Sequence, residues 1–273
     1  MRDASTDAAP VDAASDAARF DGSLDARVPD AEVTDPDCIT TPDAITVALY
    51  TFDSDPPTSV RNDGPGGGSG SIIGTIPHVA GRCGQAIHFG TTDPTPFVGI
   101  PDSPSWDLPV GSLDFWVRVP AALGAVGILS RDALGNVESG HLTVYLGETG
   151  HLVVRMQSDT DDNAVFRCSD APVPVDTWVR VGINFGAPGV ELWVDGALSS
   201  RVADVPLDSS RGISVAFCAN NAPIGIDGNG EPWLLGGSAD TSPVGATSPV
   251  LPFADGEIDQ LRISSGRRDY SAP

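Results

Sequence analysis

The sequence predicts an all-β fold, a two-sheet antiparallel sandwich that follows a disordered N-terminal tail. From Cys38 onward, apolar and polar residues alternate over short segments, which is typical of half-buried antiparallel strands. Gly and Pro turns separate these segments, and no amphipathic helical pattern interrupts them. The residues before Cys38 have almost no large apolar side chains, so they have no face to bury.

The clearest strands are residues 112–119 and 178–185. In the first, Leu113, Phe115, Val117 and Val119 alternate with Ser112, Asp114, Trp116 and Arg118; in the second, Val179, Val181, Ile183 and Phe185 alternate with Trp178, Arg180, Gly182 and Asn184. Further along, Asp195-Gly196 lies between two apolar segments. This dipeptide favours the tight turn of a β-hairpin. Many short strands joined by such turns predict a sandwich.

The chain divides by composition into two parts. Residues 1–37 repeat an Asp-Ala theme, in which like charges repel and nothing offsets the entropy lost on ordering. We interpret them as a disordered Asp/Ala-rich linker. Residues 38–273 are expected to form the β-sandwich domain.

The net charge excludes several partners. The 273 residues carry 15 basic and 37 acidic side chains, a formal charge of −22. Nucleic acid and anionic membranes both attract Lys and Arg, so neither is an expected partner. No apolar run approaches the ~20 residues that a membrane-spanning helix needs, so we expect no membrane insertion.

The four cysteines predict two disulfides. None of them lies in a C-x-x-C pair, which makes a zinc site a poor interpretation. We predict the pairs Cys38–Cys83 and Cys168–Cys218, the alternative being four buried free thiols. Disulfides indicate an extracellular or cell-surface location. Met1-Arg2-Asp3 opens directly into polar sequence. For an extracellular protein we therefore expect that a signal or lipid-anchor sequence is missing from this chain.

An ordered series of motifs resembles a known family. Gly81-Arg82-Cys83-Gly84-Gln85-Ala86-Ile87-His88-Phe89 is similar to the G-x-x-G-x-A-(I/L)-x-F strand of laminin-G-like jelly-roll domains. Residues 48–53, 62–67, 98–104, 112–119, 177–181, 192–196 and 255–263 resemble other segments of those domains, in the same order. The resemblance is to the concanavalin A-like lectin and glucanase jelly rolls of secreted or lipoprotein-type bacterial surface proteins. It implies the sandwich architecture more than any activity.

The catalytic pattern of the hydrolases with this fold is incomplete. Glu257 and Asp259 match two acids of their E-x-D-x-(x)-E strand, but Leu261 and Arg262 occupy the positions where the third acid would fall. Because glycoside cleavage needs a pair of carboxyl groups, we assign no catalytic residue.

Asp53 and Asp259 are the candidate metal ligands. Asp53 ends the first strand, and strand alternation places Asp259 on the core-facing side with Leu261 and Ile263. A buried Asp must be neutralised or hydrogen-bonded. The resemblance implies that the first and last strands are neighbours, so the two acids and loop carbonyls could bind calcium. A metal-free polar network is the alternative.

Trp233 with Asp227, Asn229 and Glu231 is the candidate ligand site. An aromatic ring beside acidic and amide side chains on an exposed rim is suited to stacking on a sugar. Trp116, Trp178 and Trp193 lie off the main apolar rows and are further candidates. The alternative is that these rings pack beneath loops.

These features predict a non-catalytic extracellular binding module whose partner is a polysaccharide or a cell-surface glycan. One alternative is a structural or adhesion domain of a surface lipoprotein that binds a protein. A second is a glycoside hydrolase of the same fold.

Overall fold

The structure is a computed structural model that describes residues 37–92, 95–119, 124–132, 140–157, 164–208, 213–226, 230–238 and 251–271. The predicted linker therefore lies outside the described residues, apart from Asp37. In the part that is described, the helical structure is one 3-10 turn, η1 (Pro104–Trp106). No helix there is long and apolar enough to cross a membrane.

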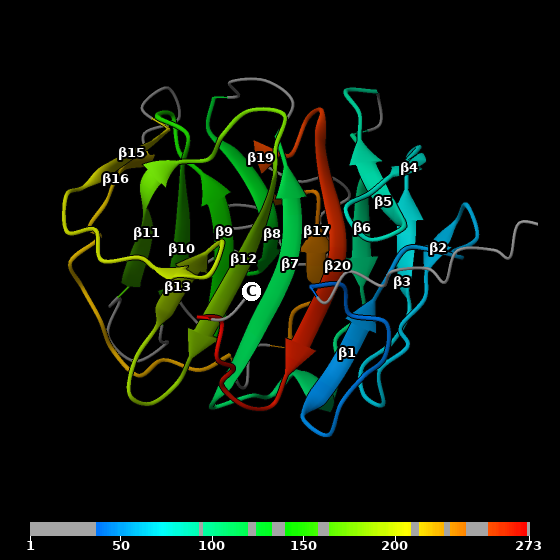
Figure 1. The fold of residues 1–273 in the computed structure, drawn as a ribbon, viewed down its shortest axis with the longest axis horizontal. Helices are drawn as coiled ribbons and strands as arrows, with labels where there is room; N and C mark the ends of the chain where they lie inside the picture. The colour runs from blue at the N-terminus through cyan, green and yellow to red at the C-terminus, as the bar shows by residue number, and fades with distance from the viewer. Residues whose placement is uncertain are drawn as a thin grey trace, which may run out of the picture. The chain divides into compact units, whose positions relative to one another are not determined.

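Two large antiparallel sheets make up the fold (Figure 1). The first, sheet A, has the strand order β14 (Ala197–Leu198), β13 (Glu191–Val194), β12 (Trp178–Phe185), β7 (Gly111–Arg118), β20 (Gly256–Ser264), β5 (Gln85–Phe89) and β4 (His78–Ala80). β1 (Thr46–Tyr50) also pairs with β20, so the first and last strands are neighbours, as expected.

Sheet B lies behind sheet A in Figure 1. Its strand order is β11 (Ala164–Pro172), β10 (His151–Gln157), β9 (His141–Leu146), β8 (Val126–Arg131), β17 (Trp233–Leu235), β6 (Phe97–Ile100), β3 (Gly70–Ile73) and β2 (Ser59–Val60). Two short strand pairs complete the described fold: β15 (Val205–Asp208) with β16 (Ile213–Ala216), and β18 (Gly237–Ser238) with β19 (Leu251–Pro252).

The core lies between the sheets and is built from the predicted alternation. Leu113 and Val117 of β7 and Val181 of β12 are fully buried in it, as are Leu142 of β9 and Val154 of β10. Burial of each such side chain contributes roughly 1.5–3 kcal/mol. The prediction of an all-β, two-sheet antiparallel sandwich is confirmed.

The Asp195-Gly196 hairpin forms as predicted. Val194 pairs with Ala197, and the two turn residues have φ angles of 47° and 78°. Two positive φ angles in succession define the turn type whose twist matches that of the flanking strands.

Both predicted disulfides form. Cys38 is bonded to Cys83 and Cys168 to Cys218, each with a Cα–Cα distance of 5.5 Å. The first joins the segment before β1 to the turn before β5. The second joins β11 of sheet B to the residues after β16.

Candidate functional site

Trp233 is buried, and its prediction as an exposed rim residue is wrong. Its exposed fraction is 0%, and its ring meets that of Trp106 edge to face at 6.3 Å. The reason is the position of β17, which pairs with β6 on one side and β8 on the other. Trp233 and Leu235 therefore both point into the core, and Trp233 has no free face for a sugar.

The neighbours of Trp233 are held by a buried arginine. Arg131 donates from Nε to the Glu231 carbonyl oxygen at 3.1 Å and from Nη1 to the Ile226 carbonyl oxygen at 2.5 Å. Glu231 is itself only 6% exposed, so it does not form an open rim either. Asp227 and Asn229 lie outside the described residues, and their role stays a prediction.

Asp259 does not share a face with Leu261 and Ile263. Gln260 forms a bulge with a φ angle of 48°, and the pairing of β20 with β7 shifts there. A bulge inserts an unpaired residue and so reverses the alternation beyond it. Asp259 consequently lies opposite Trp116 on the outer face of sheet A, whereas Leu261 and Ile263 remain in the core.

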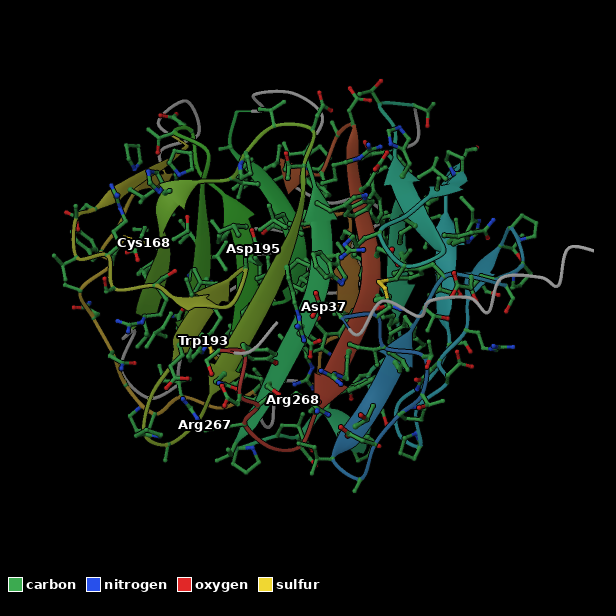
Figure 2. All side chains as sticks on the ribbon, viewed as in Figure 1. Asp37, Cys168, Trp193, Asp195, Arg267 and Arg268 are labelled. Atoms are coloured by element: carbon green, nitrogen blue, oxygen red, sulfur yellow. A yellow bond between two sulfur atoms is a disulfide. The ribbon has the colours of Figure 1, made fainter. Side chains whose placement is uncertain are left out.

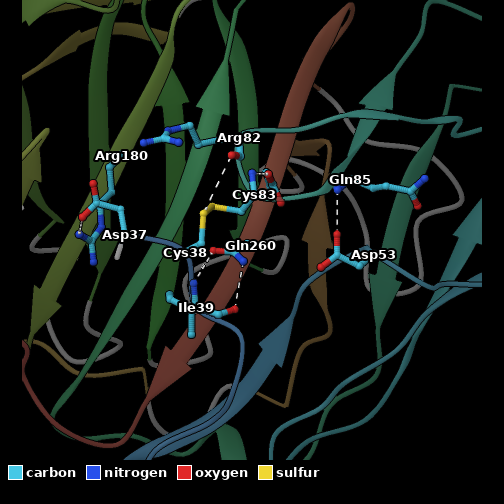
Figure 3. The surroundings of a disulfide bond; sticks show 10 residues. Asp37, Cys38, Ile39, Asp53, Arg82, Cys83, Gln85, Arg180 and Gln260 are labelled. Carbon is cyan, nitrogen blue, oxygen red and sulfur yellow. Dashed lines mark hydrogen bonds and ion pairs between the residues drawn. A yellow bond between two sulfur atoms is a disulfide. The ribbon is translucent and has the colours of Figure 1, made fainter. Parts of the chain in front are cut away.

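Asp259 is nevertheless fully buried, because it lies against Gly81 and Cys83 of the turn before β5. Cys83 of this turn is bonded to Cys38 (Figure 3). Its Oδ2 accepts a hydrogen bond from the Cys83 N–H at 2.8 Å. Its Oδ1 is buried without a hydrogen-bond partner among the described residues. Burial raises the pKa of Asp259 to about 7, and the negative charge of Asp53 adds to this rise.

Asp53 lies on the other side of the same turn. It is exposed, and its Oδ1 accepts a hydrogen bond from the Gln85 N–H at 2.8 Å (Figure 3). The structure thus brings both predicted metal ligands to one turn. No group of three His, Cys, Asp or Glu side chains suited to a metal occurs in the described residues. The two carboxylates fit a cation only if carbonyl oxygens or water complete its shell.

A row of polar and aromatic side chains crosses the outer face of sheet A. Glu257 of β20 lies opposite both His88 of β5 and Arg118 of β7, and Arg118 lies opposite Trp178 of β12. Arg118 bonds Glu257 through Nε to Oε2 at 2.5 Å and through Nη2 to Oε1 at 2.7 Å. Its guanidinium carbon is 5.6 Å from the Trp178 ring centroid. We call these four residues the sheet A row.

The sheet A row is accessible, although Glu257 at its centre is buried. The side chains of His88 and Arg118 are 27% and 33% exposed, against 6% for Glu257. The indole of Trp178 is partly exposed. The row therefore presents a ring and several hydrogen-bonding groups to solvent, held in place by a fixed ion pair.

The other two candidate tryptophans of this face differ in exposure. Trp116 is 7% exposed, and the Arg82 guanidinium lies 5.0 Å from its ring centroid. Trp193 packs against Tyr270 of the C-terminal segment at 6.4 Å, and Figure 2 shows it on the same side of the molecule as Arg267 and Arg268. The packing alternative holds for Trp116, whereas Trp193 packs on Tyr270 and stays partly exposed.

A buried polar network on sheet B escaped the sequence analysis. Asp132 contacts His141 Nδ1 at 2.5 Å through Oδ1, and its Oδ2 accepts from Thr143 at 2.7 Å and Arg155 at 2.8 Å. The alternation of His141 and Thr143 with apolar residues is the sequence feature that places both polar side chains on one face of a strand. Because Asp132, His141 and Thr143 are all buried, this network fixes strand ends and offers no open surface.

Comparison with known proteins places the fold among sandwich domains. No family model matches the chain, and no curated protein matches it. Domain 4 of AbnA, an extracellular GH43 arabinanase from Geobacillus stearothermophilus solved with arabinotriose, aligns over 83% of this chain and 95% of its own, with TM-score 0.56 and 15% identity.

Two larger proteins contain a similar domain. Botulinum neurotoxin type C, described as entering cells through two ganglioside molecules, aligns with TM-score 0.53 and 11% identity over 83% of this chain and 49% of its own. Trypanosoma rangeli sialidase with sialic acid aligns with TM-score 0.52 and 11% identity over 85% and 32%.

At these identities the likeness shows the fold alone. The likeness to these neighbours agrees with the two-sheet sandwich that the sequence resemblance implies. The laminin-G-like label itself stays a prediction, since no family model matches. Some neighbours belong to glycosidases and others to binding domains, so activity must be argued from the side chains of this chain.

Proposed function

We propose that this chain is a non-catalytic extracellular module that binds carbohydrate, and that the sheet A row contacts the sugar. The observation that carries the proposal is the partly exposed Trp178 ring beside the fixed Arg118–Glu257 pair. An indole presents a flat apolar face, while the partly exposed Arg118 guanidinium can donate hydrogen bonds to sugar hydroxyls. The glycans named for the neighbours, arabinotriose and sialic acid among them, support a carbohydrate partner at this coarse level.

The state of Glu257 supports a binding role over a catalytic one. Both of its oxygens accept hydrogen bonds from Arg118, so the ion pair occupies the carboxylate. A glycosidase acid must give up a proton, and a nucleophile must reach the sugar. The positions for a third acid hold Leu261, which is buried in the core, and Arg262, which is paired with Asp114.

The ligand is expected to be neutral rather than anionic. Each arginine that faces out between β7 and β20 has an acidic partner: Arg118 has Glu257, and Arg262 has Asp114 at 2.9 Å. In a chain of charge −22, no surplus cation on these strands attracts a carboxylate or sulfate. The two disulfides are consistent with an extracellular location, where such a glycan would be encountered.

Calcium at Asp53 and Asp259 is the second part of the proposal. A bound calcium ion would be coordinated by the buried Oδ1 of Asp259 and would offset the repulsion between the two carboxylates. The ion would have a structural role, holding the turn before β5 against β1 and β20. Calorimetry with calcium and with chelator tests it: an unchanged melting temperature would contradict it.

A glycan array tests the carbohydrate proposal. We expect wild-type protein to bind neutral glycans but not sialylated ones, Trp178→Ala to lose that binding, and Val202→Ala to retain it. Val202 is a suitable control because its side chain is 72% exposed. No binding across the array, combined with capture by a purified surface protein, would instead favour the adhesion alternative.

A further inference from the structure

Phe217 is the most exposed aromatic side chain among the described residues. It is 57% exposed, while its neighbours Ala216 and Cys218 are fully buried. Trp178 and Trp193 reach only partial exposure. Single exposed apolar residues are common on protein surfaces, so exposure alone does not make a site; what distinguishes Phe217 is how it is held.

The backbone on both sides of Phe217 is fixed. β16 ends at Ala216 and pairs with β15, and Cys218 is bonded to Cys168 of β11. Val205, Ala216 and Cys218 belong to a small core that packs on sheet B. The ring is therefore presented to solvent from a rigid base, which lowers the entropy lost when a ligand binds.

The same turn carries an amide group. The Asn220 N–H donates to the Phe217 carbonyl oxygen at 3.4 Å, which makes residues 217–220 a reverse turn with the ring at one end and an exposed Asn220 at the other. An amide both donates and accepts hydrogen bonds, and a phenyl ring offers an apolar face. Both side chains are exposed on this one turn, and a sugar ring has an apolar C–H face and hydroxyls at its rim that suit these two kinds of group.

Local charge favours a neutral ligand here as well. Asp170 lies two residues beyond Cys168 on β11 and is exposed; its carboxylate accepts from the Ser200 N–H at 3.0 Å. Arg167 also lies next to Cys168, and Arg201 donates to the Asp170 carbonyl oxygen at 3.5 Å. Charges of both signs thus lie near the disulfide, and no net positive charge there attracts an acidic sugar.

We infer that Phe217 and Asn220 form a second sugar-contacting site, separate from the sheet A row, that takes a neutral sugar ring. This inference rests on the proposed carbohydrate-binding function. It makes the module bivalent, because the sheet A row lies on β5, β7, β12 and β20 whereas Phe217 and Asn220 lie in the turn after β16. Bivalence raises the apparent affinity for long polysaccharides without new contacts.

Native affinity electrophoresis through gels that contain soluble arabinan, galactan or β-glucan tests the inference. We expect at least one polysaccharide to retard the wild type. Phe217→Ala and Asn220→Ala should each weaken that retardation about threefold or more, while Phe217→Tyr, which keeps the ring, and Val202→Ala should not. Since Phe217 is on the surface, its variants are expected to unfold like the wild type, and urea titration checks this.

The outcomes separate this inference from the proposed function. If Trp178→Ala abolishes retardation but Phe217→Ala moves like the wild type, the second site is refuted and the first stands. If none of the polysaccharides retards the wild type and the array is also silent, both are refuted. If Phe217→Tyr loses as much retardation as Phe217→Ala, the ring of Phe217 does not stack on the sugar.

Discussion

Arg118 and Glu257 form a bidentate ion pair across β7 and β20, with N–O distances of 2.5 and 2.7 Å. The pair lies at the centre of a row that His88 and Trp178 complete. Glu257 is one of the two acids that match the hydrolase strand pattern, and both of its carboxylate oxygens are occupied by this pair. The hydrogen bonds to Glu257 also raise the pKa of Arg118.

Removing one partner of this pair should destabilise the protein. Glu257→Gln leaves the Arg118 guanidinium without its counterion, and we expect the free energy of unfolding to fall by about 1–3 kcal/mol. Urea unfolding measures it, with a double-mutant cycle that adds Arg118→Met to isolate the pair. An unchanged stability in Glu257→Gln would show that the pair does not hold the two strands together.

The two disulfides should contribute similarly to stability. They span 45 and 50 residues, and loops of that length are stabilised by roughly 2–4 kcal/mol each. We expect Cys38→Ser/Cys83→Ser and Cys168→Ser/Cys218→Ser each to lose that amount in denaturant unfolding. If Phe217 depends on its rigid base, the second double variant should also weaken retardation by polysaccharide. A loss of binding in the first variant only would contradict this assignment.

The buried Asp259 should make stability depend on pH in a direction opposite to most carboxylates. Its pKa rises from 3.8 when unfolded to about 7 when folded. Protonated Asp259 therefore contributes stability that is fully present below pH ~4 and is lost as the pH rises through ~7. We expect Asp259→Asn to remove this decline, which is measured by urea unfolding between pH 4 and pH 8. Identical pH profiles for the two proteins would contradict the prediction, and a decline that calcium abolishes would support the metal proposal.

Trp233 and Trp178 should behave in opposite ways. Trp233 is fully buried against Trp106, so Trp233→Ala opens a cavity and should cost about 3–5 kcal/mol. Trp178→Ala removes a partly exposed ring and should change stability by less than about 1 kcal/mol. Thermal and urea unfolding compare the two. A stable, fully folded Trp233→Ala that loses glycan binding would instead restore Trp233 to the ligand site.

Local pattern predicted the fold well, and contacts between distant strands account for most of what it did not predict. The alternation around Leu113 and Val181 and the Asp195-Gly196 turn are properties of neighbouring residues, so they could be predicted directly. Asp259 was assigned to the wrong face because the bulge at Gln260 leaves no mark in the alternation of apolar residues. Trp233 was misplaced because its burial depends on β6 and β8, which are remote in sequence. The sheet A row combines residues from 88 to 257. The sequence alone does not tell which residues of such distant strands lie opposite one another.

The most direct test of the central claim mixes the protein with insoluble polysaccharide and measures both the depletion of the protein from solution and the release of reducing ends. The account predicts that wild-type protein is depleted by at least one neutral polysaccharide, that Trp178→Ala is not, and that no reducing ends appear. Reducing ends released at a rate that Glu257→Gln abolishes would contradict the non-catalytic assignment. Equal depletion of wild type and Trp178→Ala would contradict the sheet A row as the binding site.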